Sequence, residues 1–152
     1  MSILIADLET NGFTPDTIWV VGILDYDTDE FRSYTGEDVA EGLMRIAEAD
    51  LVIGHNFGVY DAAVIDKLTD GLIIIDVDRI VDTLAMGRRL LPEMKKQSLE
   101  EWGDILGLPK IVFNEGFDRF HPKMVPYCER DCRLNKRVFD FLIEIQDAQD
   151  AA

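Results

Sequence analysis

Asp7 and Glu9 stand two residues apart at the end of the first hydrophobic run of the chain, residues 2–8. In a strand, residues i and i+2 point to the same side, so the two carboxylates would lie next to each other. Such a pair repels itself unless a cation lies between the groups. Carboxylate oxygens are ligands that Mg²⁺ and Mn²⁺ prefer. The spacing therefore indicates a divalent-metal site, with a solvated strand end as the alternative.

A second acid follows a short apolar run, residues 51–54, in the sequence His55-Asn-Phe-Gly-Val-Tyr-Asp61. A loop that leaves the C-terminal end of a strand and opens a helix is where α/β proteins place their ligands. Asp61 would lie at the helix N-terminus, where the dipole favours the ionised form. The alternative is that Asn56 or Asp61 only caps the helix. For Asp82, at the start of a later helix, capping is the expected role.

The third acid is Asp131, four residues after Tyr127. On a helix this spacing puts both side chains on one face, about 6 Å apart along the axis. A tyrosine hydroxyl in that position can orient a water molecule while the carboxylate holds a metal. The alternative is a packed tyrosine beside an exposed acid. Cys128 and Cys132, the only cysteines, are expected to pack rather than to bind metal.

Apolar periodicity predicts the elements that position these residues. Strands are expected at residues 2–8, 17–25, 30–34 and 51–54, the second and third forming a hairpin. Helices are expected at residues 37–49, 60–68, 82–91, 98–106 and 126–145, with residues 146–152 frayed. Ser98 and Gly107 are the expected caps of the fourth helix. Early strands, late helices and alternation between them predict an α/β domain with a mixed central sheet flanked by helices.

The charge balance limits the class of partner. The 152 residues carry 30 acidic and 15 basic side chains, a net charge of -15. Nucleic acids are polyanions, so this balance argues against a strong stand-alone binder. An enzyme that holds its substrate through bound cations and a few local contacts stays compatible with it. Residues 79–110 hold six basic against five acidic residues, and Arg130, Arg133 and Arg137 share a helix face; each group is either a solvated face or a contact surface.

Two further expectations concern the cellular setting. No apolar run approaches the roughly 18 residues needed to span a membrane, so we expect no membrane partner. The chain opens directly as a strand without a basic leader, and two cysteines do not make a disulfide scaffold. These features predict a cytoplasmic protein, in the host cytoplasm if a bacteriophage encodes it.

In order, Asp7-x-Glu9, Asn56-x3-Tyr60-Asp61 and Tyr127-x3-Asp131 resemble the three motifs of the DEDD superfamily of 3′–5′ exonucleases. The tyrosine four residues before the last acid matches the DEDDy branch. Asp82-Thr-Leu and Ser98-Leu-Glu-Glu-Trp-Gly-Asp-Ile-Leu-Gly are similar to the proofreading exonuclease domain of bacteriophage family A DNA polymerases. The resemblance covers about residues 2–145. It implies a ribonuclease H-like fold and a single exonuclease domain, residues 1–152.

The resemblance also implies roles for the site residues. Asp7, Glu9, Asp61 and Asp131 would hold two divalent cations, Mg²⁺ or Mn²⁺, that clamp the scissile phosphate. Asp7 would bridge both ions, and Tyr127 would orient the attacking water. The expected substrate-binding residues are Leu8, Thr10, Asn56 and Phe57. Leu8 and Phe57 would wedge or stack the terminal bases, with ordinary core packing as the alternative for Phe57. Trp102 is expected in the core, and His55 has no expected catalytic role.

The expected reaction removes nucleoside 5′-monophosphates from the 3′ end of single-stranded DNA, as in proofreading during DNA replication. A 3′–5′ exoribonuclease is one alternative, because the acid set does not select the sugar. Another is a non-catalytic or partner-dependent subunit of a split polymerase, although the intact acid set argues against a non-catalytic module. The family polymerases continue into a polymerase domain. A free-standing nuclease, a partner of a separate DNA polymerase subunit and an excised domain are therefore all open.

Overall fold

A mixed five-stranded sheet forms the centre of the computed structural model, which describes residues 1–152. The strands are β1 (Ile3–Thr10), β2 (Ile18–Asp25), β3 (Phe31–Thr35), β4 (Leu51–Gly54) and β5 (Ile80–Asp82), in the spatial order β3-β2-β1-β4-β5. Strands β1, β2 and β3 pair antiparallel, whereas β4 and β5 run parallel to β1. The predicted α/β class with a mixed sheet is confirmed, and so is the predicted hairpin of β2 and β3.

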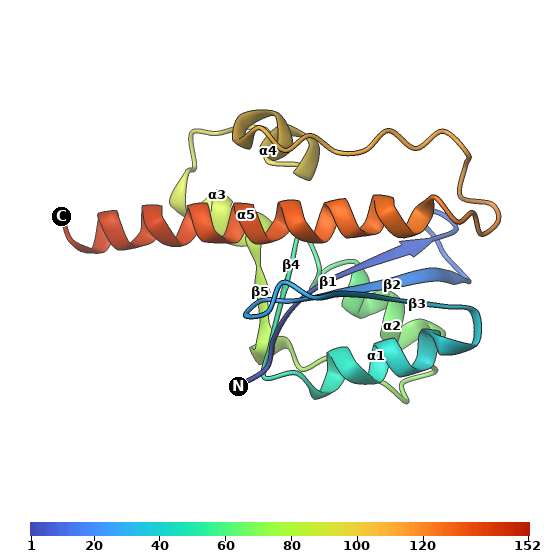
Figure 1. Ribbon diagram of the computed structural model, residues 1–152. Coiled ribbons are helices and arrows are strands. Elements are labelled where there is room, and N and C mark those ends of the chain that lie inside the picture. The colour runs from blue at the N-terminus through green and yellow to red at the C-terminus, as the bar shows by residue number, and fades with distance from the viewer.

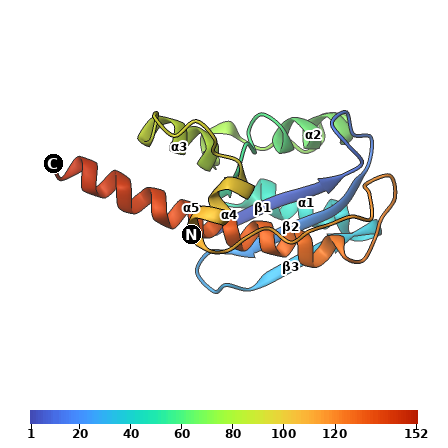
Figure 2. The same ribbon diagram turned by 90° about the horizontal axis from the view of Figure 1, so that it is seen from above.

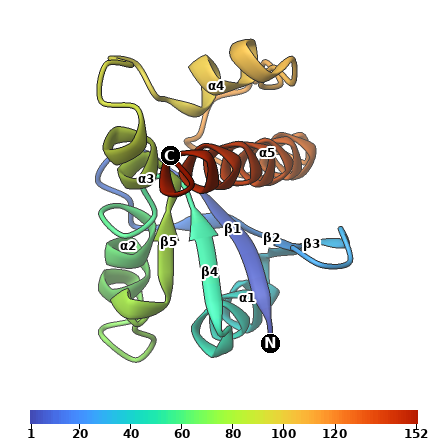
Figure 3. The ribbon, with the colours of Figure 1, turned by 90° about the vertical axis from the view of Figure 1, so that its left-hand side faces the viewer.

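Helices cover both faces of this sheet (Figure 1). They are α1 (Val39–Glu48), α2 (Asp61–Leu68), α3 (Thr83–Leu90), α4 (Leu99–Leu106) and α5 (Met124–Asp150), with short 3₁₀ turns η1 (Gly36–Asp38) and η2 (Val77–Arg79). Figure 3, a view close to the axis of α5, shows α5 above the sheet and α1 below it. Helix α4 lies outside α5, so the chain forms layers. No helix has both the length and the apolar character needed to cross a membrane.

Two apolar layers hold the sheet between these helices. Leu4, Ala6 and Leu8 of β1 point toward α1 and α2, and they share one core with Ile46 and Ile65. On the opposite face β1 presents Ile5, which packs against Cys132 of α5. Trp102 is buried between α3, α4 and α5, as expected. Because side chains alternate along a strand, Asp7 and Glu9 follow Ile5 onto the face that α5 covers.

Helix ends agree with the sequence in part. Asp82 caps α3 by accepting from the Leu84 amide, and Ser98 caps α4 by accepting from the Glu101 amide. Gly107 ends α4 in the left-handed region, at φ 72°. Neither Asn56 nor Asp61 caps α2, which begins after Tyr60 without a side-chain cap. The capping alternative for those two residues is therefore wrong.

Two further differences have simple causes. The sequence analysis did not predict β5, because its three residues run without a turn signal from η2 into α3. The prediction of a frayed tail at residues 146–152 is wrong, since α5 continues to Asp150. No proline or glycine interrupts that stretch, and Gln149 donates to the carbonyl of Leu90 at 3.1 Å. The last turns of α5 project beyond the sheet (Figure 2).

Candidate active site

Strand β1 and helix α5 bring the acids of the first and third motifs together. Helix α5 lies directly on β1 and β2. A side chain at Gly22 of β2, which pairs with Asp7, would collide with the sulfur of Cys128. The missing side chain therefore lets α5 approach the strand ends closely. Tyr127 and Asp131 flank Cys128 on that helix, so the same close approach carries them to Asp7.

A cavity of about 540 Å³ opens at this place. It is lined by both ends of the expected constellation and by substrate-binding candidates: Asp7, Leu8, Glu9, Thr10, Gly12, Phe13, Asn56, Tyr60, Lys110, Phe117, Tyr127 and Asp131. Asp61 is not among the lining residues. It is 6% exposed, and burial, followed by the charge of the nearby Asp7, raises its pKa. Four of the five predicted catalytic side chains thus share one cavity, and the fifth supports it from inside the protein.

Burial and mutual repulsion dominate the electrostatics of the acids. Burial raises the pKa of Glu9 to about 11, and the charge of Asp7 adds to this rise. Burial, followed by the charge of Asp7, likewise raises the pKa of Asp131 to about 7 and that of Asp61 well above its ordinary value. Asp7 is the common neighbour in all three cases. It therefore occupies the centre of the acid cluster, where an ion shared between ligands would lie.

Lys110 is the one cation among the residues that line this cavity. Its ammonium lies 3.3 Å from Oδ2 of Asp131 and 5.1 Å from the centre of the Tyr127 ring. The Asp131 charge raises the pKa of Lys110 against the opposing effect of burial, so the amine stays charged. Lys110 lowers the pKa of Asp131, but burial and Asp7 outweigh it. One lysine therefore does not neutralise four carboxylates.

The donor set fits divalent cations. Oδ1 of Asp131 is buried without any hydrogen-bond partner, which is expensive unless a ligand satisfies it. Carboxylate oxygens of Asp7 and Glu9 and the sulfur of Cys128 lie within 4.8 Å of one another. The contact with Cys132, together with burial, raises the pKa of the Cys128 thiol well above its ordinary value. Cys128 is thus a neutral thiol 3.7 Å from Asp7, and the hard oxygens are the ligands suited to Mg²⁺ or Mn²⁺.

The loop after β1 shapes one wall of the cavity. The Tyr60 hydroxyl donates to the carbonyl of Gly12 at 2.7 Å and lies 2.9 Å from the Thr10 hydroxyl. Asn56 has a left-handed backbone at φ 59°, a conformation that asparagine tolerates. Asp82 holds it there, because its carboxylate accepts from the amides of Asn56 and Gly58. The capping acid thus also fixes the loop that carries Asn56.

Phe57 is not available to a substrate. Its side chain is fully buried in the core beneath the sheet, against Gly54 at the end of β4. The expected stacking role is therefore wrong, and core packing, the alternative, is correct. Of the other expected substrate residues, Leu8, Thr10 and Asn56 all line the cavity.

Besides Gly12 and Tyr60, three lining residues were not predicted as site residues: Phe13, Lys110 and Phe117. Phe13 is 98% exposed at the cavity mouth, and its apolar ring in a Gly-Phe-Thr-Pro turn was the available signal. Lys110 and Phe117 belong to the irregular segment 107–123 between α4 and α5, where no spacing rule places a side chain. That segment is tied down by the Trp19 indole, which donates to the Phe117 carbonyl at 2.8 Å. The ring of Phe117 lies 6.2 Å from that of Tyr127.

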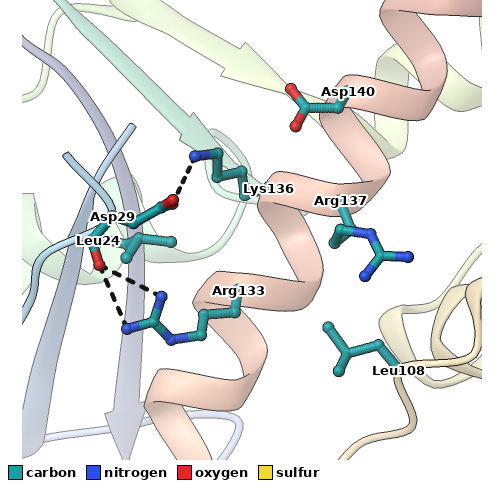
Figure 4. Close-up of a pocket in the computed structure, with 7 residues that line it drawn as sticks. All are labelled: Leu24, Asp29, Leu108, Arg133, Lys136, Arg137 and Asp140. Atoms are coloured by element: carbon teal, nitrogen blue, oxygen red, sulfur yellow. Dashed lines mark hydrogen bonds and ion pairs between the residues drawn. The ribbon is translucent and has the colours of Figure 1, made fainter. Parts of the chain in front are cut away.

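A second cavity, of about 330 Å³, borders the middle of α5 near the β2–β3 turn (Figure 4). It contains Arg133, Lys136 and Arg137, and the first two of these cations are paired with carboxylates of the protein. Lys136 lies 2.6 Å from Asp29, and Arg133 lies 2.9 Å from Glu129. Arg133 also donates to the Asp29 carbonyl. These contacts hold the β2–β3 hairpin against α5, so this face of α5 has a structural role.

Comparisons with known proteins agree with this architecture. NrnC of Brucella melitensis bound to pGG has a TM-score of 0.75 at 18% identity, over 97% of this chain and 74% of that one. A second structure of that protein contains bound Mg²⁺. The family B DNA polymerase of the archaeon Pyrobaculum calidifontis has a TM-score of 0.72 at 15% identity, over 94% of this chain and 24% of that one. Phi29 DNA polymerase with primer-template DNA has a TM-score of 0.64 at 12% identity, over 98% of this chain and 32% of that one.

At these identities the likeness establishes the fold, which is ribonuclease H-like, as predicted. This chain spans only 24% and 32% of the two polymerases. No curated protein sequence matches it. A model of the RNase H superfamily matches residues 4–107, well over half of the chain, including Asp7, Glu9 and Asp61. The chain therefore belongs to the RNase H superfamily.

Proposed function

We propose that this protein is a metal-dependent 3′–5′ exonuclease of the DEDDy type, formed as a single domain over residues 1–152, that acts on the 3′ end of single-stranded DNA. The observation that carries the proposal is the acid cluster itself. Three carboxylates and a single lysine line one cavity, a fourth buried carboxylate is close enough for the charge of Asp7 to raise its pKa, and one buried oxygen of Asp131 has no partner. Divalent cations are the ligands that would relieve this repulsion.

The proposed metal ligands are Asp7, Glu9, Asp61 and Asp131, with Asp7 shared between two sites. Cations held there would supply charge neutralisation and Lewis-acid activation for phosphodiester hydrolysis. Because Asp61 is buried, we propose that it binds the metal indirectly, through a water molecule. The other three acids line the cavity, so we assign them direct contact with the metals.

Protein side chains have separate roles in this scheme. Tyr127 lines the cavity one helical turn before Asp131, and we assign its hydroxyl the role of orienting the attacking water. Lys110 holds Asp131 in position and adds positive charge where the phosphate would lie. Phe13 replaces Phe57 as the proposed stacking surface for a terminal base, since it is exposed and lines the cavity. Leu8, Thr10 and Asn56 remain the proposed contacts to the last nucleotides.

The comparisons support a nucleic-acid substrate without selecting its sugar. One structure of similar fold carries pGG and another carries primer-template DNA. DNA is our first choice because of the motif resemblance to proofreading domains. The rival substrate is the 3′ end of RNA, and the rival role is a polymerase subunit that needs its partner for activity.

The deciding experiment follows 5′-labelled single-stranded DNA and RNA of the same sequence on denaturing gels, with Mg²⁺, Mn²⁺ or EDTA. We expect a metal-dependent ladder that shortens from the 3′ end of DNA. Asp7→Ala, which removes the shared ligand, should abolish it. The variant's unaltered circular dichroism would show that it is folded.

Other outcomes redirect the proposal. A faster ladder on RNA would assign the enzyme to RNA turnover. Cleavage inside a circular substrate would contradict an exonuclease. Absence of any ladder with either metal would favour a partner-dependent or non-catalytic subunit.

A further inference from the structure

We call the cavity lined by Asp7, Glu9 and Asp131 the acid cavity. A third cavity, which we call the groove, adjoins it on the side of α3. It has a volume of about 360 Å³ and lies between α3 and the segment that leads into α4. Its polar lining includes His55, Asn56, Arg88, Lys95, Gln97 and Ser98. Asn56 also lines the acid cavity. The two cavities therefore meet at Asn56, the residue that Asp82 fixes.

The cations of this groove have no partner in the protein. No carboxylate lies within 4 Å of Arg88 or Lys95, and neither side chain donates a hydrogen bond to any protein group. Both are exposed. Although the chain carries a net charge of -15, no acid neutralises these two cations, so both are available to an anionic ligand. Arg133 and Lys136 on α5, in contrast, are both paired.

A rigid network forms the floor of the groove. Nε2 of His55 donates to the carbonyl of Gln97 at 2.7 Å, and Nδ1 lies 2.9 Å from the Thr83 hydroxyl. Asn135 of α5 donates to that hydroxyl at 2.7 Å. Burial lowers the pKa of His55, so the imidazole is neutral and contributes geometry rather than charge. The network joins β4, α3, α5 and the start of α4, and it fixes the two walls of the groove relative to each other.

We propose that this groove binds the backbone phosphates of nucleotides on the 5′ side of the scissile linkage. The inference rests on the proposed function, since it assumes that the 3′ end lies in the acid cavity. A nucleic-acid strand that leaves the acid cavity past Asn56 would next pass Arg88 and Lys95. Arginine and lysine bind phosphate oxygens irrespective of base. Substrates long enough to reach the groove would therefore bind more tightly than a dinucleotide.

The test compares two double variants with the same charge change. Arg88→Gln with Lys95→Gln removes the groove cations. Arg89→Gln with Lys96→Gln removes the adjacent arginine and lysine, which are equally exposed but do not line the groove. For a dodecamer, we expect the groove variant to raise KM on the order of 10-fold with kcat unchanged, and the control to change KM less than about 2-fold. For a dinucleotide, both variants should equal wild type.

Binding provides a readout that does not depend on cleavage. The measurement is fluorescence anisotropy of a labelled dodecamer with Mg²⁺, with Asp7→Asn added to every protein to prevent cleavage. In the groove variant, the slope of log Kd against log salt concentration should be smaller by about 1.4, because each of two lost phosphate contacts contributes about 0.7. Equal losses in both double variants would overturn the groove, leaving only a general charge effect. An equal loss for the dinucleotide would also overturn it. If wild type cleaves nothing, the proposed function fails, while the anisotropy comparison still decides whether the groove binds phosphate.

Discussion

Helix α5 borders two cavities of opposite electrostatic character. At its N-terminal end, Asp131 joins an acid cluster that has only Lys110 as a counterion. Farther along, Arg133 and Lys136 lie in a cavity where acids of the hairpin and of α5 itself neutralise them. The paired charges hold the hairpin to the helix and need no ligand. We expect the unpaired acids to make the fold less stable without metal, and such residual repulsion is typical of a binding site.

Among the variants that compare the two cavities, Glu9→Gln should have the largest effect on function. Because the pKa of Glu9 is raised to about 11 without metal, the amide mimics the protonated acid, and we expect metal-free stability to be kept or increased. Loss of a metal ligand should lower kcat/KM on the order of 10³-fold, several kcal/mol of transition-state stabilisation. Hydrolysis rates and thermal melting in EDTA measure the two effects. A variant that melts well below wild type in EDTA would contradict an acid cluster that is strained without metal.

The pH dependence of stability tests the same repulsion. Burial raises the pKa of Asp131 from 3.8 to about 7, so the folded state retains a proton that the unfolded chain loses. The stability this provides is present below about pH 4 and is lost as the pH rises through about 7. We expect the metal-free melting temperature to fall between pH 5 and pH 8, and Mg²⁺ to raise it more at pH 8. Asp131→Asn should flatten the fall, and a metal-free melting temperature that stays level would refute the picture.

Tyr127→Phe removes one hydroxyl from the acid cavity. If that hydroxyl orients the attacking water, kcat should fall about 10²-fold while metal affinity is retained. Tyr26→Phe is the matched control, because its hydroxyl donates to Asp140 at 2.6 Å beside the basic cavity. That control should leave kcat unchanged. Equal rates for Tyr127→Phe and wild type would remove Tyr127 from the mechanism.

Asp29→Asn should have the smallest effect, confined to stability. It breaks the pair with Lys136, whose partner carboxylate is 63% exposed. Exposed pairs contribute less than about 1 kcal/mol, so the melting temperature should drop by a few degrees at most. Asn tolerates the left-handed backbone at this position, φ 61°. Cleavage rates should match wild type, and a marked loss of activity would mean that the basic cavity also serves the substrate.

Local patterns predicted the parts of the molecule that local physics decides. The two-residue spacing of Asp7 and Glu9 placed both on one face of β1, and the Ser98 cap began α4 where expected. The period of four between Tyr127 and Asp131 likewise put both at the same cavity. Each of these features depends on neighbours within one strand or one helical turn.

Other features depend on contacts between distant segments, which spacing does not encode. Phe57 lies next to cavity residues in sequence but turns into the core, because Gly54 leaves room for its ring. Lys110 reaches Asp131 only because an irregular segment folds back along α5, where Arg130 donates to the Pro109 carbonyl. Tertiary packing, rather than composition or periodicity, decided both positions.

The place of α5 after all the other elements of the domain has a consequence for folding. The strands and helices α1 to α4 belong to the first 106 residues, but Tyr127 and Asp131 arrive only with the last helix. Joining Asp7 to Asp131 closes almost the whole chain into a loop, which is slow because its entropy must be lost before the contact forms. A nascent or partly folded chain would hold three of the four acids and lack the tyrosine. Catalytic activity would therefore appear late in folding, only after α5 has packed on the sheet.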